Sequence, residues 1–363
     1  MRSLISLAVV ATLSSGCTWI SGTLADRKDE KPGIQVEKLK APPGYAVTVL
    51  SRDVPKAREM ALAPGGMLFL GSNEGNVYVV KLDGSSASPA RVILKGMKSS
   101  GVAYANGALF VADRDKIHRY DNILTTLEAP KPVTIVSGLP EKERHAARFM
   151  AIGPDGKLYI SVGSPCNVCE AENDNYGTII RVNTDGSGRE VVARGIRNTV
   201  GFDWNPKDGS LWFSENGQDE LGPDQPNDEL NRVSKVGENF GFPYCHAGTI
   251  PDPKLGTKHS CSEFTPPVVG LGAHVAALGM RFVRGDGTVI IARHGSHPPS
   301  RVAYDVVRLK VDGTKAGSME PFLTGFLQGR EYWGRPADVL PMADGSVLVA
   351  DDLNGAIYRV AKN

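Results

Sequence analysis

The sequence contains six segments that share one pattern: a short apolar strand, a turn with glycine, a second apolar strand, a polar turn and usually a third strand. Two of them read "ARFMAIGPDGKLYISVGS" and "TVGFDWNPKDGSLWFSENG". Glycine suits such turns because it adopts positive φ angles at little cost. The segments begin at Arg58, Gly101, Ala147, Thr199, Leu278 and Pro336, and their turn glycines are Gly66, Gly107, Gly156, Gly209, Gly287 and Gly345.

Each segment is typical of an antiparallel meander with an apolar face that one sheet leaves unburied. Six such sheets stacked radially bury these faces against their neighbours, so we predict an all-β fold, a six-bladed β-propeller. The 41 glycines and 24 prolines fit a chain of many short strands. No long amphipathic helix is visible, which disfavours a TIM barrel. We expect Tyr45–Leu50, "YAVTVL", to be the outer strand of the last blade and to close the ring.

The N-terminus has a separate pattern. Residues 1–17 have the layout of a secretory signal, with a basic start, a short apolar run and a final "SSGC". The Gly-Cys pair resembles a bacterial lipobox, so we expect a periplasmic lipoprotein anchored through Cys17; an ordinary exported protein cut nearby is the alternative. The polar residues 18–40 are predicted to be a flexible tether, and residues 41–363 the propeller.

Charge and cysteine content limit the partners and the compartment. The 41 Lys and Arg residues nearly balance the 40 Asp and Glu residues, so nothing indicates a nucleic acid, or a membrane surface beyond the lipid anchor. Cys166 and Cys169 form a C-x-x-C motif, and Cys245 and Cys261 lie sixteen residues apart. Export favours two disulfides, Cys166–Cys169 and Cys245–Cys261, with a zinc site as the alternative.

The longest gap between turn glycines runs from Gly209 to Gly287, and about residues 215–275 within it are predicted to be a functional insert. Its start, "SENGQDELGPDQPNDELN", is acidic and rich in glycine and proline. Loops of this kind often bind Ca²⁺, which takes carboxylate and carbonyl oxygens. The spacing does not match an EF-hand, and an acidic loop is often only a solvated surface.

Several polar residues stand at equivalent places, just before the first strand of a repeat. His145 and Arg148 precede the first strand of the third blade, Arg197 and Asn198 that of the fourth, and Arg335 that of the sixth. A lone histidine is more often structural than catalytic. Propeller loops meet at a central channel, however, and guanidinium groups pair well with carboxylates. The set therefore predicts a site for a planar polyanion; local pairing of each arginine at a blade edge is the alternative.

These motifs give the sequence a resemblance to a known family. It resembles the soluble sugar dehydrogenases that depend on pyrroloquinoline quinone (PQQ), the glucose/sorbosone dehydrogenase group, and in particular the L-sorbosone dehydrogenase-like proteins. The resemblance covers nearly all of the chain after the tether. The stretches that carry it are "ARFMAIGPDGKLYISVGSPCNVCE", "GIRNTVGFDWNPKDGSLWFSENGQDELGPDQPNDELN", "ENFGFPYCHAG" and "VIIARHGS".

The resemblance implies PQQ and Ca²⁺ as cofactors and a role for each matching residue. His145 matches the general base that takes the proton from a sugar hydroxyl, a role that suits a neutral imidazole. Arg197 matches the arginine that stabilises negative charge on the quinone oxygen, and Asn198 matches a PQQ hydrogen-bond partner. Gly217 and Gln218 match the pair of backbone carbonyls that binds Ca²⁺.

The sequence departs from the glucose-type members of that family at three places. Arg144 stands where they carry an aspartate, and Ala337 where they carry a second arginine. Their PQQ-binding lysine has no certain counterpart, and Arg293 or His294 is predicted to take its place. His274 is a further candidate for the channel, with a structural role as the alternative. The predicted cofactor-binding residues are therefore Arg148, Asn198, Arg293, His294 and Arg335.

Together these features predict an oxidoreductase that depends on PQQ and calcium and oxidises a sugar or sugar aldehyde. Base-assisted hydride transfer to PQQ is expected, with electrons passed to an external acceptor. The sequence has no G-x-G-x-x-G nicotinamide fingerprint. One alternative is a calcium-dependent lactone hydrolase of the six-bladed type, which needs acidic and asparagine side chains at the metal. The other is a non-catalytic propeller that only binds a ligand.

Overall fold

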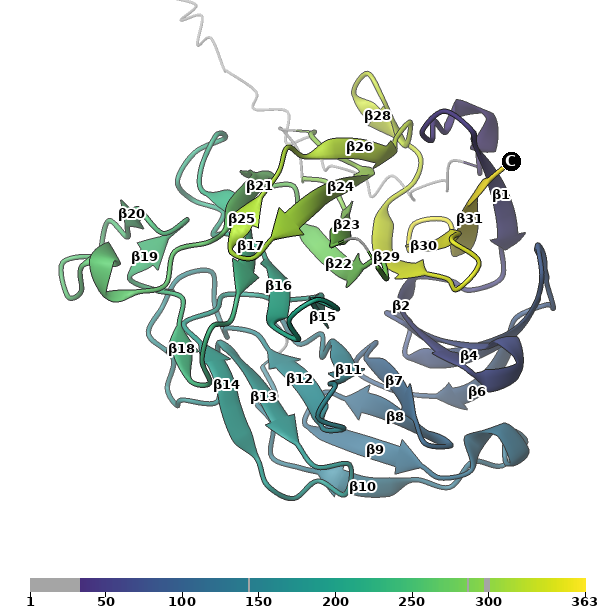
Figure 1. Ribbon diagram of the computed structural model, residues 1–363. Coiled ribbons are helices and arrows are strands. Elements are labelled where there is room, and N and C mark those ends of the chain that lie inside the picture. The colour runs from purple at the N-terminus through teal and green to yellow at the C-terminus, as the bar shows by residue number, and fades with distance from the viewer. Residues whose placement is uncertain (1–32, 143, 286, 297–300) are drawn as a thin grey trace, which may run out of the picture. The chain divides into compact units, whose positions relative to one another are not determined.

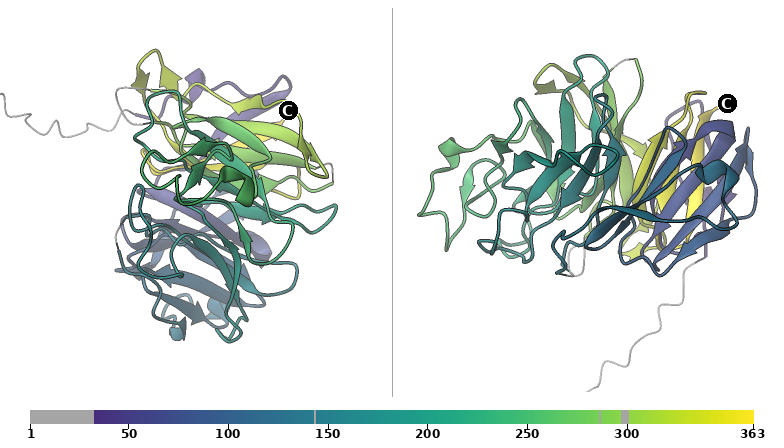
Figure 2. Two further views of the ribbon diagram at one scale, coloured as in Figure 1. Left: turned by 90° about the vertical axis from the view of Figure 1, so that its left-hand side faces the viewer. Right: turned by 90° about the horizontal axis from the view of Figure 1, so that it is seen from below.

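The computed structural model describes residues 33–142, 144–285, 287–296 and 301–363. Six sheets in this part of the chain surround a central axis, each built on four antiparallel strands, which confirms the predicted six-bladed β-propeller (Figure 1). Edge-on views show the sheets packed side by side as blades (Figure 2). The predicted signal, lipid anchor and first part of the tether lie in residues 1–32, outside the described residues.

The blades follow one another along the chain, and the first strand of each blade lies nearest the axis (Figure 1). Blade one consists of β2 (Ala57–Ala63), β3 (Met67–Ser72), β4 (Asn76–Asp83) and β6 (Arg91–Lys95). Blade two consists of β7 (Val102–Ala105), β8 (Ala108–Asp113), β9 (Lys116–Tyr120) and β10 (Val133–Val136). Blade three consists of β11 (Met150–Ile152), β12 (Leu158–Val162), β13 (Thr178–Val182) and β14 (Glu190–Arg194). Blade four consists of β15 (Phe202–Trp204), β16 (Leu211–Glu215), β17 (Asn227–Arg232) and β21 (Val269–Ala273). Blade five consists of β22 (Ala277–Phe282), β23 (Thr288–Arg293), β24 (Asp305–Asp312) and β26 (Glu320–Leu323). Blade six consists of β29 (Pro336–Pro341), β30 (Val347–Asp351), β31 (Ala356–Lys362) and β1 (Tyr45–Ser51).

The remaining elements are short. They are β5 (Ser86–Ala87), β18 (Glu238–Asn239), β19 (Cys245–His246), β20 (Ile250–Pro251), β25 (Lys315–Ala316), β27 (Leu327–Gln328) and β28 (Glu331–Tyr332), with the 3-10 turns η1 (Val36–Lys38), η2 (Pro64–Gly66), η3 (Ile123–Thr125) and η4 (Cys261–Glu263). Across the described ranges, no helix has the length and apolar character needed to span a membrane.

The six turn glycines lie between the first and second strands of their blades, as predicted, and each has a positive φ angle between 71° and 83°. Other residues are strained in this region of φ. The predicted closing strand also forms: β1 pairs antiparallel with β31, so the first strand of the chain completes the last blade. The two ends of the propeller are thereby joined in one sheet.

Apolar side chains fill each of the six spaces between neighbouring blades. The space between blades three and four shows the packing: the Phe149 and Phe202 rings meet edge to face at 4.8 Å, as do those of Tyr159 and Trp204. Such contacts add to the gain from burying apolar surface. Radial stacking therefore buries the face that a single blade would leave exposed.

Polar side chains link the innermost strands near the axis. The Asp338 carboxylate of β29 accepts a hydrogen bond from the Met60 N–H of β2 at 2.9 Å. The Asp203 carboxylate of β15 likewise accepts one from the Phe282 N–H of β22 at 2.8 Å. Buried polar groups need such partners, and these two bonds tie blade six to blade one and blade four to blade five.

Two predicted boundaries need correction. The tether was expected to reach residue 40, but Ile34 and Leu39 pack against the core between blades five and six, and Lys40 pairs with Thr324. The predicted insert at 215–275 is not one insert, because β17 and β21, the outer half of blade four, lie within it. It consists instead of two loops, residues 216–226 and 233–268.

Candidate active site

A cavity of about 720 Å³ lies among the loops of blades three, four and five. It has the size of a small-molecule site, and several polar and charged side chains are among the residues that line it. Of the residues predicted from sequence, the structure brings His145, Arg197, Asn198, Gly217 and His274 together here. The other lining residues are Arg144, Asn216, Asp219, Gly222, Pro223, Asp228, Ala276, Gly295 and Ser296.

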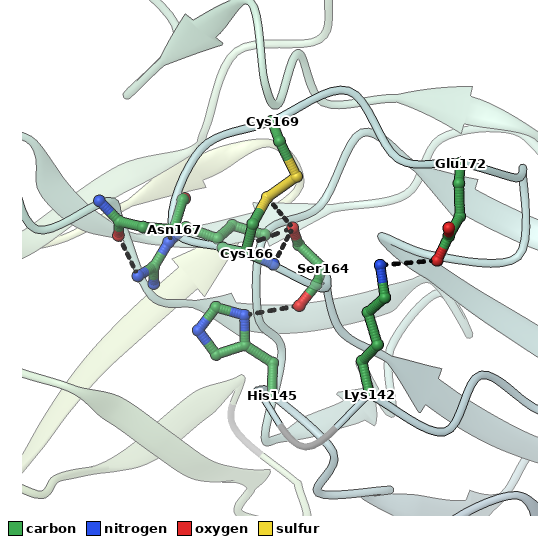
Figure 3. Close-up of a disulfide and its surroundings, with 8 residues drawn as sticks. Lys142, His145, Ser164, Cys166, Asn167, Cys169 and Glu172 are labelled. Atoms are coloured by element: carbon green, nitrogen blue, oxygen red, sulfur yellow. Dashed lines mark hydrogen bonds and ion pairs between the residues drawn. A yellow bond between two sulfur atoms is a disulfide. The ribbon is translucent and has the colours of Figure 1, made fainter.

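His145 lies in the loop that leads into β11, and its hydrogen bond defines its tautomer. Its Nδ1 is 2.9 Å from the carbonyl oxygen of Ser164 (Figure 3). Because a carbonyl only accepts, Nδ1 carries the proton and Nε2 keeps its lone pair. Burial, reinforced by the charges of Arg197 and Arg144, lowers the pKa of His145 to about 3. The imidazole is therefore neutral and able to act as a base.

Two histidines of the cavity also share an uncommon backbone conformation. His145 and His274 have φ angles of 54° and 55°, a region that residues other than glycine seldom adopt. His274 donates from Nε2 to the carbonyl oxygen of Gly222 at 2.7 Å. Conformations of this kind cluster at functional sites.

Arg197 is 4% exposed, and its guanidinium makes four hydrogen bonds. Its Nε donates to the Asn167 carbonyl at 3.0 Å, and Nη1 to the Asn216 carbonyl at 3.2 Å. Its Nη2 donates to Asn167 Oδ1 and to Asp219, both at 2.7 Å. A guanidinium has five N–H groups, so one N–H on Nη1 has no acceptor within the described ranges. This N–H is the one available to a ligand.

Asp219 and Asp228 are site residues that the sequence analysis did not single out. Asp219 pairs with Arg197 at 2.7 Å and with Arg144 at 3.5 Å, so one carboxylate joins two guanidinium groups. Asp228 accepts from the N–H groups of Gly217 at 2.9 Å and Ala277 at 3.1 Å, and burial raises its pKa to about 6. The acidic stretch after β16 was the available signal, but it holds several acids, and only the loop conformation selects these two.

Four predicted cofactor residues lie outside the cavity lining. Arg148 is buried and donates to the carbonyls of Arg114, His145 and Pro140. Arg293 forms a bidentate ion pair with Asp305. We therefore do not assign these two arginines to the site, because their donors are already bound within the fold.

The other two are His294 and Arg335. His294 Nε2 bonds to Asp352 at 2.9 Å, and burial lowers its pKa to about 4. Arg335 donates to the carbonyls of His294 at 3.2 Å and Gly295 at 3.0 Å, and it lies over the ring of Tyr304. Arg335 therefore contacts Gly295, a residue of the cavity lining, but does not itself line the cavity.

Gln218 lines a smaller cavity next to the main one, together with Gly217, Glu215 and Glu229. Burial raises the pKa of both glutamates, that of Glu229 to about 7, and Asn231 donates to Glu229 at 2.9 Å. Among the residues that the structure describes, no three or more His, Cys, Asp or Glu side chains are grouped so as to hold a metal ion.

Both predicted disulfides are confirmed. Cys166 pairs with Cys169 in the loop between β12 and β13, and Cys245 pairs with Cys261 in the second loop of blade four. Figure 3 shows the first of these beside the His145 ring, with Ser164 between the ring and the disulfide.

Comparisons with known proteins place the chain among its relatives. Residues 39–325 match the TrAA12-like family model. An uncharacterized protein of Borreliella burgdorferi is 32% identical, over 89% of this chain and 90% of that protein. A pyrroloquinoline quinone-dependent sugar dehydrogenase of Hypocrea jecorina is 23% identical, over 72% of this chain and 74% of that protein. The holo PQQ domain of a pyranose dehydrogenase from Coprinopsis cinerea has the same fold, with a TM-score of 0.76 at 18% identity over 89% of this chain and 97% of that one.

Proposed function

This chain belongs to the TrAA12-like family, and on that premise we propose that it is a PQQ-dependent dehydrogenase that oxidises a sugar or a sugar aldehyde, with calcium as a second cofactor. The observation that carries the proposal is the pair of His145 and Arg197 in one cavity. The first is an imidazole whose Nε2 has no hydrogen-bond partner among the described residues. The second is a buried guanidinium with one N–H that likewise has no acceptor in that part of the chain. A base and a cation side by side suit removal of a proton from a hydroxyl group.

The residues present fit a planar tricarboxylate such as PQQ. The cavity of about 720 Å³ is of the size that encloses cofactors, and Arg197, Arg144 and Asn198 supply cationic and amide groups to it. We assign the binding of PQQ to these three side chains. Arg335 is not in the lining but donates to the carbonyl of Gly295, which is. PQQ, when bound, supplies a two-electron oxidant that accepts a hydride.

The residues of this chain supply the proton chemistry and the electrostatics. His145 Nε2 takes the hydroxyl proton of the substrate, and the Nδ1–H bond to the Ser164 carbonyl keeps the ring in the required tautomer. The free N–H of Arg197 donates to an oxygen on which negative charge develops. For calcium we assign the carbonyl oxygens of Gly217 and Gln218, with the Asp228 carboxylate, bonded to the Gly217 N–H, as the anionic neighbour.

The test is direct. Apoprotein is titrated with PQQ in the presence and absence of Ca²⁺ while the absorbance of the cofactor is recorded. Aldoses and L-sorbosone are then added with an artificial electron acceptor. We expect saturable, calcium-dependent binding and sugar-dependent reduction of the acceptor. Absence of PQQ binding would overturn the proposal, and lactone hydrolysis with Ca²⁺ alone would replace it with a hydrolase.

Substrate, acceptor and location are finer parts of the same proposal. We infer an aldose or a sorbosone-type aldehyde as substrate and a quinone or cytochrome as the external acceptor. We also infer periplasmic export with acylation of Cys17, from the pattern of residues 1–17. Metabolic labelling with a palmitate analogue tests the last point: a Cys17→Ser variant should lose a label that the unaltered chain carries.

A further inference from the structure

The loop between β12 and β13, residues 163–177, contacts both reactive groups of the site. It contains the Cys166–Cys169 disulfide, whose Cα atoms are 6.1 Å apart. A fifteen-residue loop without strands or helices is long for a compact domain, and loops of this length are usually functional or disordered. Two of its residues, Ser164 and Asn167, each contact one of the two reactive side chains.

Ser164 links the base to the arginine and to the disulfide. Its carbonyl accepts from His145 Nδ1 at 2.9 Å, and its N–H donates to the Arg197 carbonyl at 2.7 Å. Its hydroxyl lies 3.2 Å from the carbonyl oxygen of Cys166 and 3.4 Å from the Cys166 N–H nitrogen. The carbonyl that selects the tautomer of His145 is therefore tied to the first cysteine.

Asn167 lies inside the ring that the disulfide closes and is 9% exposed. Its backbone carbonyl accepts from Arg197 Nε at 3.0 Å, and its side-chain oxygen accepts from Arg197 Nη2 at 2.7 Å. The same oxygen also accepts from the Asp219 N–H at 3.2 Å. Asn167 thus supplies two of the four acceptors of the guanidinium and fixes its plane.

The loop also has hydrogen bonds from Tyr244 to Glu170 and from Arg189 to Asn175, and two ion pairs between exposed side chains. Glu170 pairs with Lys258 at 2.6 Å, and Glu172 pairs with Lys142 at 2.7 Å (Figure 3). Exposed pairs of this kind contribute little. A ring of four residues also removes little entropy from the unfolded chain, so the disulfide acts mainly on the local conformation of the native loop.

We propose that the disulfide-closed loop is the positioning element of the active site: through Ser164 it sets the tautomer of His145, and through Asn167 it sets the orientation of Arg197. Ser164 and Asn167 are positioning residues, and opening of the disulfide releases both side chains at once. The effect on turnover rests on the proposed function, but the effect on the two side chains does not. Both cysteines are half-buried, so a dithiol reductant can reach them.

The test compares a Cys166→Ser/Cys169→Ser variant with a matched control, Cys245→Ser/Cys261→Ser, which removes the disulfide outside the loop between β12 and β13. The first readout is ¹⁵N NMR of the His145 ring in apoprotein. We expect a single Nδ1–H tautomer in the unaltered protein and in the control. A mixture of tautomers is expected in the Cys166→Ser/Cys169→Ser variant, because the free imidazole has no such preference.

The second readout is kinetic and uses enzyme loaded with PQQ and Ca²⁺. Misplacement of reacting groups by about 1 Å costs on the order of 100-fold in rate, so we expect kcat to fall by about that factor while KM changes by less than about threefold. Asn167→Ala, which keeps the disulfide, should also lower kcat. Asn167→Asp, which keeps both acceptor oxygens, should restore most of it.

The outcomes separate this inference from the proposed function. A single Nδ1–H tautomer in the variant that lacks Cys166 and Cys169 would overturn the inference, and so would an Asn167→Ala enzyme with unaltered kcat. A mixed tautomer in that variant supports it even where no preparation oxidises a sugar, in which case only the proposed function fails. Treatment of the Cys245→Ser/Cys261→Ser control with dithiothreitol opens the remaining disulfide chemically: two thiols of the reagent become its cyclic disulfide while Cys166 and Cys169 take up two electrons and two protons.

Discussion

Replacement of His145 by glutamine should make the apoprotein more resistant to acid while it abolishes most turnover. The folded protein holds this imidazole neutral, with a pKa of about 3, whereas an unfolded chain has an ordinary histidine pKa of about 6.5. At pH values between these two pKa values, His145 is protonated in the unfolded state and neutral in the folded state. Stability is therefore present above about pH 6.5 and is lost as the pH falls toward 3.

The size of the effect follows from the difference in pKa. A pH of 5 lies about 1.5 units below the pKa of the histidine in the unfolded chain. At about 1.36 kcal/mol per unit, protonation of the unfolded chain therefore lowers the free energy of unfolding by about 2 kcal/mol. At pH 8 the cost is close to zero. The groups that set it are burial of the ring, the charges of Arg197 and Arg144, and the opposing charge of Asp219. His145→Gln carries no such charge and should recover about 2 kcal/mol at pH 5.

Urea denaturation of the apoprotein at pH 5 and pH 8 measures this. Packing losses in His145→Gln are the same at both pH values, so they cancel when the two differences in unfolding free energy are subtracted. Asn198→Ala, which removes a non-titrating side chain from the same cavity, is the control and should show no pH-dependent difference. In loaded enzyme His145→Gln should lower kcat by about 10²- to 10⁴-fold. Equal effects of His145→Gln on stability at pH 5 and pH 8 would refute the argument that the fold keeps the base neutral.

Three further substitutions test other parts of the structure. Burial and the charge of Asp338 raise the pKa of Glu59 to about 8, so the native state loses stability as the pH rises from about 4.5 to 8. In urea titrations, Glu59→Gln should therefore increase the free energy of unfolding by about 3 kcal/mol at pH 7 and by almost nothing at pH 4. Phe202→Ala, at the aromatic contact between blades three and four, should cost about 3–5 kcal/mol by the same measurement. Asp219→Asn removes the carboxylate between Arg197 and Arg144 and should tighten PQQ binding a few-fold in calorimetry, a gain that falls at high salt.

The sequence predicted the scaffold well because a few residue types determine it. Glycine at six turns reflects a steric requirement for positive φ, and alternating turns and apolar strands leave radial stacking as the way to bury each sheet. The disulfide pairs were predicted from the expected export and from the spacing of the cysteines. The insert was overestimated because β17 and β21 are separated by a long loop, and spacing between glycines does not reveal strands inside it.

The site was predicted less completely, and the arginines show why. Arg197 and Arg148 look alike in sequence, since each stands just before the first strand of a blade. In the structure Arg197 reaches the cavity, while Arg148 is directed to three backbone carbonyls. The backbone conformation of the loops determines whether an arginine lines the cavity or binds backbone carbonyls. The residue pattern alone does not show where those carbonyls point. Asp219 and Asp228 were missed for the same reason.

The reactive side chains of this cavity are held mainly by backbone groups rather than by one another. The contacts are His145 to the Ser164 carbonyl, Arg197 to the Asn167 and Asn216 carbonyls, His274 to the Gly222 carbonyl, and Asp228 to the N–H groups of Gly217 and Ala277. Strand ends fix where each loop begins, but the middle of a loop needs its own restraint. Substitutions that alter loop backbone should therefore act on turnover more than on stability, whereas those in the cores between blades should act on stability first, because the blades carry most of the buried apolar surface.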